Sequence, residues 1–252
     1  MGALHDGHFS LARAAVQQAD FTIATIFVNP TQFAAGEDLT TYPRTLEEDV
    51  EQLSELGIDC VFAPEPSEVY PDGFSTFVDP PQVSKSLEGE HRPTHFRGVA
   101  TVVLKLLNMT SANKAFFGQK DYQQLVVVRQ MVRDLNVPCE IVACPTMRAE
   151  DGLALSSRNR NLSEQERQQA LSLSSTLELA ESLIRDGERD THVIMNEMKQ
   201  SLIDGGVDTI DYAMVANADD LTIPDEIELP AVCLVAAYVG GTRLIDNRIV
   251  QD

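Results

Sequence analysis

Apolar and polar positions form two alternating patterns along the first 145 residues. Short apolar runs that end at Pro, Gly or polar residues predict buried strands at 22–28, 58–63, 114–117 and 140–144. Amphipathic stretches predict helices at 11–19, 45–56, 96–109 and 122–135. Strands alternating with helices favour right-handed βαβ units, and therefore an α/β fold with a parallel sheet.

The pattern changes after about residue 150. Two helices are predicted, from Ser163 to about Asp186 and from about His192 to Asp204. Apolar runs follow at 210–216, 232–239 and 243–250, and Gly240-Gly241 between the last two is a hairpin signal. We therefore expect two domains, residues 1–147 and a smaller α+β domain over residues 148–252, with helices against an antiparallel sheet.

Two helix starts carry the capping-box pattern, in which a hydroxyl and a carboxylate satisfy each other's backbone donors. They are Thr45-Leu46-Glu47-Glu48 and Ser163-Glu164-Gln165-Glu166. Both segments are therefore predicted to fix the first residue of their helix.

Composition excludes several classes of protein. The chain has 252 residues, 43% of them hydrophobic, which argues against disorder. No window reaches the roughly 18 apolar residues of a membrane helix. The net charge of −20 argues against a nucleic-acid partner, because phosphate contacts need clustered Lys and Arg.

The charge is distributed unevenly. Residues 1–91 carry net −13 and residues 159–252 net −11, whereas residues 92–158 carry net +4. That basic segment contains Lys120, Arg148 and Arg158. It is either chance variation on a solvated surface or an anion site, with the three cations as a phosphate clamp.

The cysteines indicate a reducing compartment. Cys60, Cys139, Cys144 and Cys233 form no Cys-x-x-Cys or zinc-like spacing, and we predict no protein-built metal site. Cys60, Cys139 and Cys233 lie in apolar runs, where a free Cys is usually buried. The N-terminus lacks a signal-peptide pattern, so we expect a cytoplasmic protein.

Polar segments follow three of the predicted parallel strands. They are Asn29-Pro30-Thr31-Gln32-Phe33, Gly118-Gln119-Lys120-Asp121-Tyr122-Gln123-Gln124 and Pro145-Thr146-Met147-Arg148. Ligands bind outside the carboxyl ends of parallel strands, so these segments are expected to form one binding edge.

Two further motifs suit phosphate. His5-Asp6-Gly7-His8 precedes the first helix, and a helix N-terminus attracts anions while Gly7 allows close approach. Leu155-Ser156-Ser157-Arg158 could close over a phosphate. The alternatives are structural histidines and a polar interdomain turn.

These motifs together resemble the pantoate–β-alanine ligases, a family of the nucleotidylyltransferase superfamily. The residues that carry the resemblance are 1–8 (MGALHDGH), 27–33 (FVNPTQF), 42–45 (YPRT), 92–99 (RPTHFRGV), 116–125 (FFGQKDYQQL), 151–159 (DGLALSSRN) and 243–247 (RLIDN). The resemblance implies a Rossmann-like ATP- and pantoate-binding domain, a C-terminal lid and a homodimer.

The resemblance also implies a two-step reaction that uses ATP and Mg²⁺. Pantoate attacks the α-phosphate to give pantoyl adenylate and pyrophosphate, and β-alanine then displaces AMP to give pantothenate. The implied catalytic residues are His5, His8, Lys120 and Arg158. The implied ATP-binding residues are Met1, Gly2, His5, Gly7, His8, Gly118, Gln119, Lys120, Asp121, Met147, Leu155, Ser156, Ser157 and Arg158. For pantoate and β-alanine they are Asn29, Gln32, Tyr42 and Gln124; Arg92 and His95 lie in a family motif without an assigned role.

The chain departs from the family pattern in two places. Gln119 stands where the family often has Glu. The chain also begins at the Met of the Met-Gly-x-Leu-His motif, without the strand and helix that usually precede it. We expect a shortened chain with unpaired strand edges and an unanchored His5–His8 segment. The test is to read the DNA upstream of the Met1 codon. An in-frame apolar strand that ends in Pro-Thr would support this expectation.

Two other functions remain open. One is a nucleotidylyltransferase acting on a phosphorylated acceptor, although Gln32 and Gln124 favour an uncharged-hydroxyl acid. The other is a truncated ATP-binding protein with little ligase activity. The identity of the released product distinguishes these functions.

Overall fold

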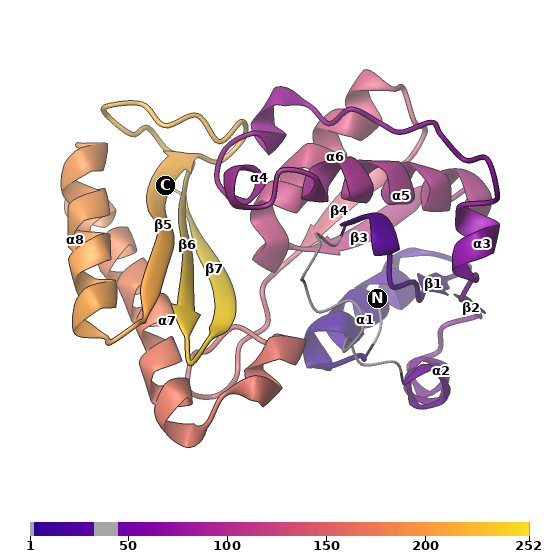
Figure 1. Cartoon of the computed structure of the whole chain (residues 1–252), viewed down its shortest axis with the longest axis horizontal. Helices are drawn as coiled ribbons and strands as arrows, with labels where there is room; N and C mark the ends of the chain where they lie inside the picture. Colours follow the sequence, from indigo (N-terminus) through magenta and orange to yellow (C-terminus); the bar gives the residue numbers. More distant parts are fainter. Residues whose placement is uncertain (1–2, 33–44, 252) are drawn as a thin grey trace. The chain divides into compact units, whose positions relative to one another are not determined.

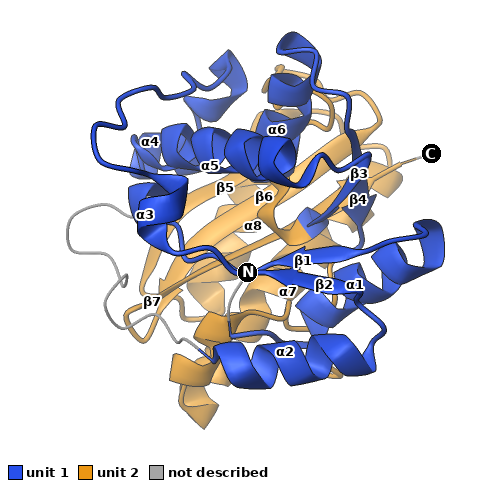
Figure 2. Cartoon of the chain, turned by 90° about the vertical axis from the view of Figure 1, so that its right-hand side faces the viewer, with its two compact units in different colours: residues 1–119, 123–145 blue, residues 120–122, 146–252 orange. Residues whose placement is uncertain are grey.

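The computed structural model describes residues 3–32 and 45–251, so the predictions for Met1, Gly2 and Tyr42 lie outside the described residues (Figure 1). The chain divides into two compact units (Figure 2). Unit 1 contains residues 1–119 and 123–145. Unit 2 contains residues 120–122 and 146–252.

Unit 1 contains two pairs of parallel strands. β1 (Ile23–Thr25) pairs with β2 (Cys60–Phe62), and β3 (Lys114–Gly118) pairs with β4 (Glu140–Cys144). Parallel pairing is therefore confirmed, but the described strands form two separate pairs and not one continuous sheet. β1 is shorter than predicted, because the chain leaves the ladder soon after Ile26 and reaches Pro30, which has no N–H to donate.

Helices cover both sides of these strands. The α-helices of unit 1 are α1 (Asp6–Gln18), α2 (Leu46–Glu55), α3 (Pro66–Val69), α4 (Glu88–His91), α5 (His95–Thr110) and α6 (Tyr122–Asp134). Short 3₁₀ turns are η1 (Pro30–Gln32), η2 (Gln82–Ser84) and η3 (Gln119–Asp121). α5 and α6 share one core with β3 and β4, and α1 and α2 share another with β1 and β2. Figure 2 shows these two helix pairs on opposite sides of the strands.

Unit 2 is a helical layer on an antiparallel sheet. The sheet has the order β5 (Thr209–Asn217), β6 (Ala231–Val239), β7 (Thr242–Val250). α7 (Glu164–Arg185) and α8 (Thr191–Asp204) pack on it, and Leu177, Met198 and Val235 are fully buried in their shared core. A 3₁₀ turn, η4 (Ser157–Asn161), precedes α7. The predicted α+β half is therefore confirmed.

Local signals differ in how well they predicted structure. Ser163 and Glu166 form the predicted capping box at α7. Gly240 and Gly241 join β6 to β7 with φ values of 56° and 75°, the left-handed conformation that this two-residue turn requires. The capping box at Thr45 is wrong: the Thr45 hydroxyl donates to the Asp49 carboxylate at 3.2 Å, and its side chain caps no helix N–H.

All four cysteines are free thiols. Cys139, Cys144 and Cys233 are buried, but Cys60 is exposed, against the prediction. Cys60 is the first residue of β2, and successive strand residues point to opposite faces, so an apolar run does not bury every member. Within the described residues, no helix is long and apolar enough to cross a membrane.

Candidate active site

The histidine motif forms the N-terminus of α1. The helix begins at Asp6, earlier than predicted, because His5 acts as its N-cap: the His5 Nδ1 accepts from the Gly7 N–H at 3.1 Å. The neutral His5 ring therefore carries its proton on Nε2. The His5 and His8 rings lie with centroids 4.2 Å apart. Two imidazoles thus share the positive end of a 13-residue helix, which suits a phosphate.

A buried carboxylate anchors the segment in front of these histidines. Asp49 on α2 is 2% exposed and accepts from the Leu4 N–H at 2.9 Å and the Ala3 N–H at 3.0 Å. The expectation that this segment is unanchored is therefore wrong. Sequence reasoning missed Asp49 because its partners lie 45 and 46 positions away.

Asn29 holds the turn that carries Gln32. The Asn29 side chain is buried, and its Nδ2 donates to Gln32 Oε1 and to the Gly98 carbonyl, both at 3.2 Å. Its Oδ1 accepts from the Tyr70 hydroxyl at 2.7 Å and the Thr31 hydroxyl at 2.9 Å. Both ends of the amide are thus used inside the protein. Asn29 therefore fixes the orientation of Gln32, and its implied place beside pantoate and β-alanine stays a prediction.

Two residues of α5 bring this turn close. A Cβ on Gly98 would lie 2.4 Å from the Thr31 carbonyl oxygen, so only glycine allows the helix to approach η1. The His95 Nδ1 lies 3.1 Å from the Gln32 carbonyl oxygen, which makes Nδ1 the donor. The Arg92 Nη1 lies 3.4 Å from the His95 Nε2, which can then accept. The motif residues Arg92 and His95 thus support the Gln32 turn.

The Lys120 segment belongs to unit 2 although unit 1 precedes and follows it in the sequence. The Lys120 carbonyl accepts from the Asn247 Nδ2 at 2.7 Å, and the Tyr122 hydroxyl donates to the Ala218 carbonyl at 2.8 Å. These two bonds fix the short 3₁₀ turn η3, which also contains Gln119 and the exposed Asp121. Tyr122 lies in the polar segment and Asn247 in the 243–247 motif named above, but sequence reasoning assigned neither residue a role.

The serine–arginine motif begins with a capped turn. The Ser156 hydroxyl accepts from the Arg158 N–H at 3.3 Å and so caps η4. Ser157 and Arg158 are half-buried in that turn, as is Leu155 before it, while Met147 is 39% exposed. The hydroxyls and the guanidinium therefore come from one ordered turn.

Arg148 is a structural cation, which corrects its assignment to the phosphate clamp. Its guanidinium makes a two-pronged ion pair with Asp246, with N···O distances of 2.6 and 2.9 Å, and the Asp246 side chain is 2% exposed. It also donates to the Gly152 carbonyl at 3.0 Å. A guanidinium held this way is committed to the fold.

Beside Arg148, the turn at Asp151 is charged. Partial burial acts to raise the pKa of Asp151, but hydrogen bonds from the Leu153 N–H and Arg167, with the charge of Arg167, outweigh it and hold the pKa below its usual value. The ionised Asp151 therefore stabilises the turn that leads to Ser156.

The remaining predicted residues are placed as follows. Gly7 lies in the first turn of α1, Gly118 ends β3, and the half-buried Gln124 lies in the first turn of α6. The described part of the chain contains no group of three His, Cys, Asp or Glu side chains arranged to hold a metal ion.

Curated relatives match almost the whole chain. A pantothenate synthetase from Moorella thermoacetica is 49% identical over 251 residues, covering 100% of this chain and 89% of its own length. A pantothenate synthetase from Rhodopirellula baltica is 50% identical and covers 98% of this chain and 88% of its own length. This chain therefore spans about nine-tenths of these relatives.

Solved structures and a family model agree with these relatives. A pantothenate synthetase from Thermus thermophilus is 42% identical with a TM-score of 0.96, covering 100% of this chain and 91% of that one. A pantoate-beta-alanine ligase from Francisella tularensis, complexed with beta-gamma ATP and beta-alanine, is 36% identical with a TM-score of 0.77 and covers 99% and 87%. The family model described as pantoate-beta-alanine ligase matches residues 1–249, and the chain belongs to that family.

Proposed function

We propose that this chain carries out the ligase reaction of its family: ATP-dependent condensation of (R)-pantoate with β-alanine, through pantoyl adenylate, releasing AMP and pyrophosphate. The observation that carries the proposal is the His5–His8 pair at the N-terminus of α1, held in place by Asp49. A related structure is complexed with beta-gamma ATP and beta-alanine, and the proposed reaction uses ATP and β-alanine.

The first step is a transfer of an adenylyl group. A pantoate carboxylate oxygen attacks the α-phosphorus of ATP, and the bond from that phosphorus to the bridging oxygen breaks, releasing pyrophosphate. Negative charge gathers on the phosphoryl oxygens, so catalysis depends on positioned donors and cations. We assign His5, His8 and Lys120 to the transferring phosphate, and Ser156, Ser157 and Arg158 to the departing phosphates.

Amide groups suit the organic acid. Pantoate presents hydroxyl groups and a carboxylate, and a primary amide can both donate and accept hydrogen bonds. We assign Gln32 and Gln124 to pantoate, with Tyr42 bordering the pantoate and β-alanine space. Because Asn29 donates to Gln32 Oε1, we assign the donor role toward pantoate to the Gln32 Nε2.

The second step is an acyl transfer. The neutral amine nitrogen of β-alanine attacks the acyl carbon of pantoyl adenylate and loses one proton to solvent as the amide bond forms, and AMP leaves with the electrons of the broken C–O bond. We assign Gly118, Gln119, Asp121, Met147 and Leu155, with Met1, Gly2 and Gly7, to the rest of the ATP site. The Ser156–Arg158 turn would then keep the reactive anhydride from water.

Mg²⁺, the oligomeric state and the location complete the proposal. Mg²⁺ commonly binds through substrate phosphates and water, so we expect the oxygens of ATP to hold it. Bound there, it would neutralise phosphate charge.

The family pattern suggests a homodimer. Four free thiols fit a reducing compartment, so we propose a cytoplasmic location.

The test follows products from ATP, Mg²⁺, pantoate and β-alanine. We expect pyrophosphate that requires pantoate and AMP that requires both organic substrates. Pyrophosphate release with a phosphorylated alcohol would instead indicate another nucleotidylyltransferase, and ATP binding without turnover would indicate a binding protein.

Two substitutions test the residue roles. His8→Ala and Lys120→Ala should each slow pantoyl adenylate formation by about 10²–10³-fold, the usual effect of removing one stabilising donor. The exposed His192 and Lys199 on α8 provide matched controls, and their Ala variants should retain the normal rate. Unchanged adenylate formation in Lys120→Ala and His8→Ala would overturn the assignment.

A further inference from the structure

Two polar side chains are buried near the end of β7. Asp246 is 4% exposed and Asn247 is 5% exposed, although both side chains are polar. They pair with Val235 and Leu234 of β6 and, as neighbours on a strand, point to opposite faces. Burying polar groups costs free energy unless each finds hydrogen-bond partners, so their partners indicate what they hold.

Asp246 holds the turn that precedes the Ser156–Arg158 motif. Its carboxylate accepts from the Arg148 Nη1 at 2.6 Å and the Nη2 at 2.9 Å. Arg148 in turn donates to the Gly152 carbonyl at 3.0 Å. The backbone closes the same turn, since the Leu155 N–H donates to the Met147 carbonyl at 2.9 Å.

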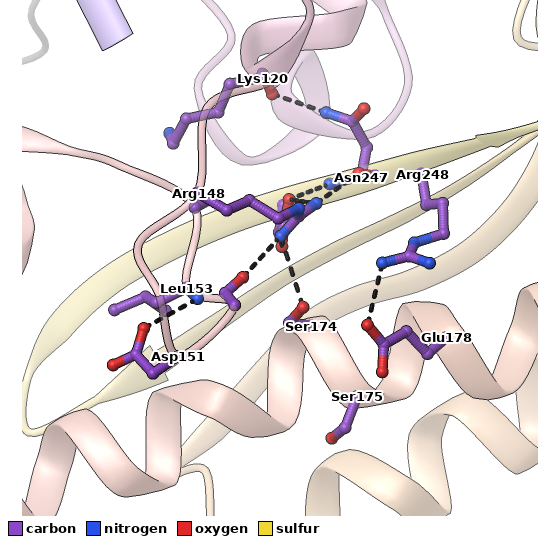
Figure 3. A network of polar contacts seen from close by, with 12 residues as sticks. Lys120, Arg148, Asp151, Leu153, Ser174, Ser175, Glu178, Asn247 and Arg248 are labelled. Atoms are coloured by element: carbon purple, nitrogen blue, oxygen red, sulfur yellow. Dashed lines mark hydrogen bonds and ion pairs between the residues drawn. The ribbon is translucent and has the colours of Figure 1, made fainter. Parts of the chain in front are cut away.

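Asn247 holds the Lys120 segment. Its Nδ2 donates to the Lys120 carbonyl oxygen at 2.7 Å, across 127 positions of sequence. The two halves of the network are also joined, because the Asp246 Oδ1 accepts from the Asn247 N–H at 2.8 Å. The Arg148 Nη2 donates to the Asn247 carbonyl at 3.2 Å. Figure 3 shows Asn247 between Lys120 and Arg148, with the Lys120 side chain extending away from the network.

We infer that Asp246 and Asn247 are positioning residues that hold two phosphate-binding segments in one register: η3 with Lys120, and the turn that leads to Ser156–Arg158. The inference rests on the proposed function, because it assumes that both segments act on the triphosphate of ATP. Neither residue needs to contact substrate.

The geometry distinguishes this role from ordinary packing. The Lys120 bond depends on the donor at Nδ2, whereas packing depends only on the shape of the side chain. Asn247→Asp keeps the shape but replaces that donor with an acceptor facing a carbonyl. Asn247→Ala removes both donor and shape. The two variants together separate hydrogen bonding from volume.

The control is another buried donor in unit 2. Thr191 is 1% exposed, and its hydroxyl donates to the Pro224 carbonyl at 2.7 Å. Thr191→Val removes that donor without touching Lys120 or Arg148. It therefore reports the general effect of losing one buried side-chain-to-backbone bond.

The first measurement is pantoate-dependent pyrophosphate release in a single turnover of the full chain. Asn247→Ala and Asn247→Asp should slow it at least about tenfold, because small displacements of catalytic groups are costly. The KM for pantoate should stay within about twofold, because the lost interaction acts on the transition state. Thr191→Val should match the unsubstituted protein.

The second measurement is hydrogen–deuterium exchange, which needs no turnover. Both Asn247 variants should speed exchange over residues 118–124 and leave α7 and α8 unchanged. Asp246→Asn, which keeps the shape but weakens the Arg148 pair, should speed exchange over residues 147–158. This measurement tests the positioning of the segments even if no pantoate-dependent pyrophosphate forms, which would be the separate failure of the proposed function.

Two outcomes would overturn the inference. In the first, Asn247→Asp releases pyrophosphate at the normal rate while residues 118–124 exchange faster. The hydrogen bond from Asn247 to Lys120 would then hold the segment without affecting the rate of catalysis. In the second, neither Asn247 variant changes exchange over residues 118–124, so the bond does not hold the segment.

Discussion

The two units present their proposed phosphate-binding groups in different ways. Unit 1 presents His5 and His8 from a regular helix, and one buried carboxylate, Asp49, holds the residues in front of it. Unit 2 presents Lys120 and Arg158 from short 3₁₀ turns. In unit 2, a network of side chains around Asp246 holds these turns in place.

The difference follows from what each backbone provides. A helix fixes its own side-chain directions and its N-terminal N–H groups, so only its entry needs an anchor. A short 3₁₀ turn has few internal hydrogen bonds, and its orientation must come from tertiary contacts. Unit 2 therefore uses more buried polar groups for the same task.

The sharpest test of this comparison is Arg148→Ala in unit 2. The change leaves the buried Asp246 carboxylate without its cation, so we expect about 3–5 kcal/mol of destabilisation. Urea unfolding of unit 2, followed by thiol labelling of the buried Cys233, measures it. Arg167→Ala is the control, since its pair with Asp151 is partly exposed and worth about 1 kcal/mol or less. If Arg148→Ala lowers the free energy of unfolding no more than Arg167→Ala does, the network around Asp246 contributes little to the stability of unit 2.

The matching test in unit 1 is Asp49→Ala. It leaves the Ala3 and Leu4 N–H groups without their acceptor, so we expect about 2–4 kcal/mol of destabilisation. Labelling of Cys144 during urea unfolding follows unit 1. Asp49→Asn keeps one acceptor oxygen but turns an NH₂ donor toward the other N–H, so it should also destabilise unit 1. If Asp49→Ala slows adenylate formation but leaves the hydrogen-exchange rates of residues 3–8 unchanged, Asp49 does not act as an anchor for this segment.

A smaller effect is expected at Gly98. The added methyl group of Gly98→Ala meets the Thr31 carbonyl, so α5 and η1 must separate, at a cost of about 1–3 kcal/mol. Gln32 moves with η1, so the KM for pantoate should rise more than the KM for ATP. Equal changes in the KM values for pantoate and ATP would show that the position of η1 has no specific effect on pantoate binding.

The smallest effect needs no substitution. Cys60 is exposed, whereas burial raises the pKa of Cys233 to about 12. At pH 8 the buried thiol carries almost no thiolate, so it reacts only when unit 2 opens. Cys60 should therefore label at once in native protein, and Cys233 only after denaturant is added. Rapid native labelling of Cys233 would indicate that unit 2 opens more easily than its core implies.

Sequence patterns predicted the elements better than the contacts between them. The periodicity of residues 96–109 and 122–135 gave α5 and α6 within a residue or so at each end, because an apolar stripe repeats every helical turn. Gly240-Gly241 gave the hairpin because its turn requires positive φ. Such signals are local and can be identified from one sequence.

The errors come from tertiary contacts. Thr45 has the residues of a capping box, but Asp49 competes for its hydroxyl. Arg148 has the charge of a phosphate ligand, but Asp246 lies 98 positions away and pairs with it. Asp49 and Asn247 carry no motif that reports their partners. The motifs therefore predicted which residues take part in the chemistry, but not which residues hold them in place.

The membership of residues 120–122 in unit 2 has a consequence for how the protein can be divided. The chain passes from unit 1 to unit 2 at residue 120, returns at residue 123 and crosses again at residue 146. A fragment of residues 146–252 would lack Lys120 and Tyr122, and would leave the Asn247 amide and the Ala218 carbonyl without these partners. The C-terminal half is therefore not a transplantable module, and recombination that preserves the site must exchange the 120–122 segment together with it.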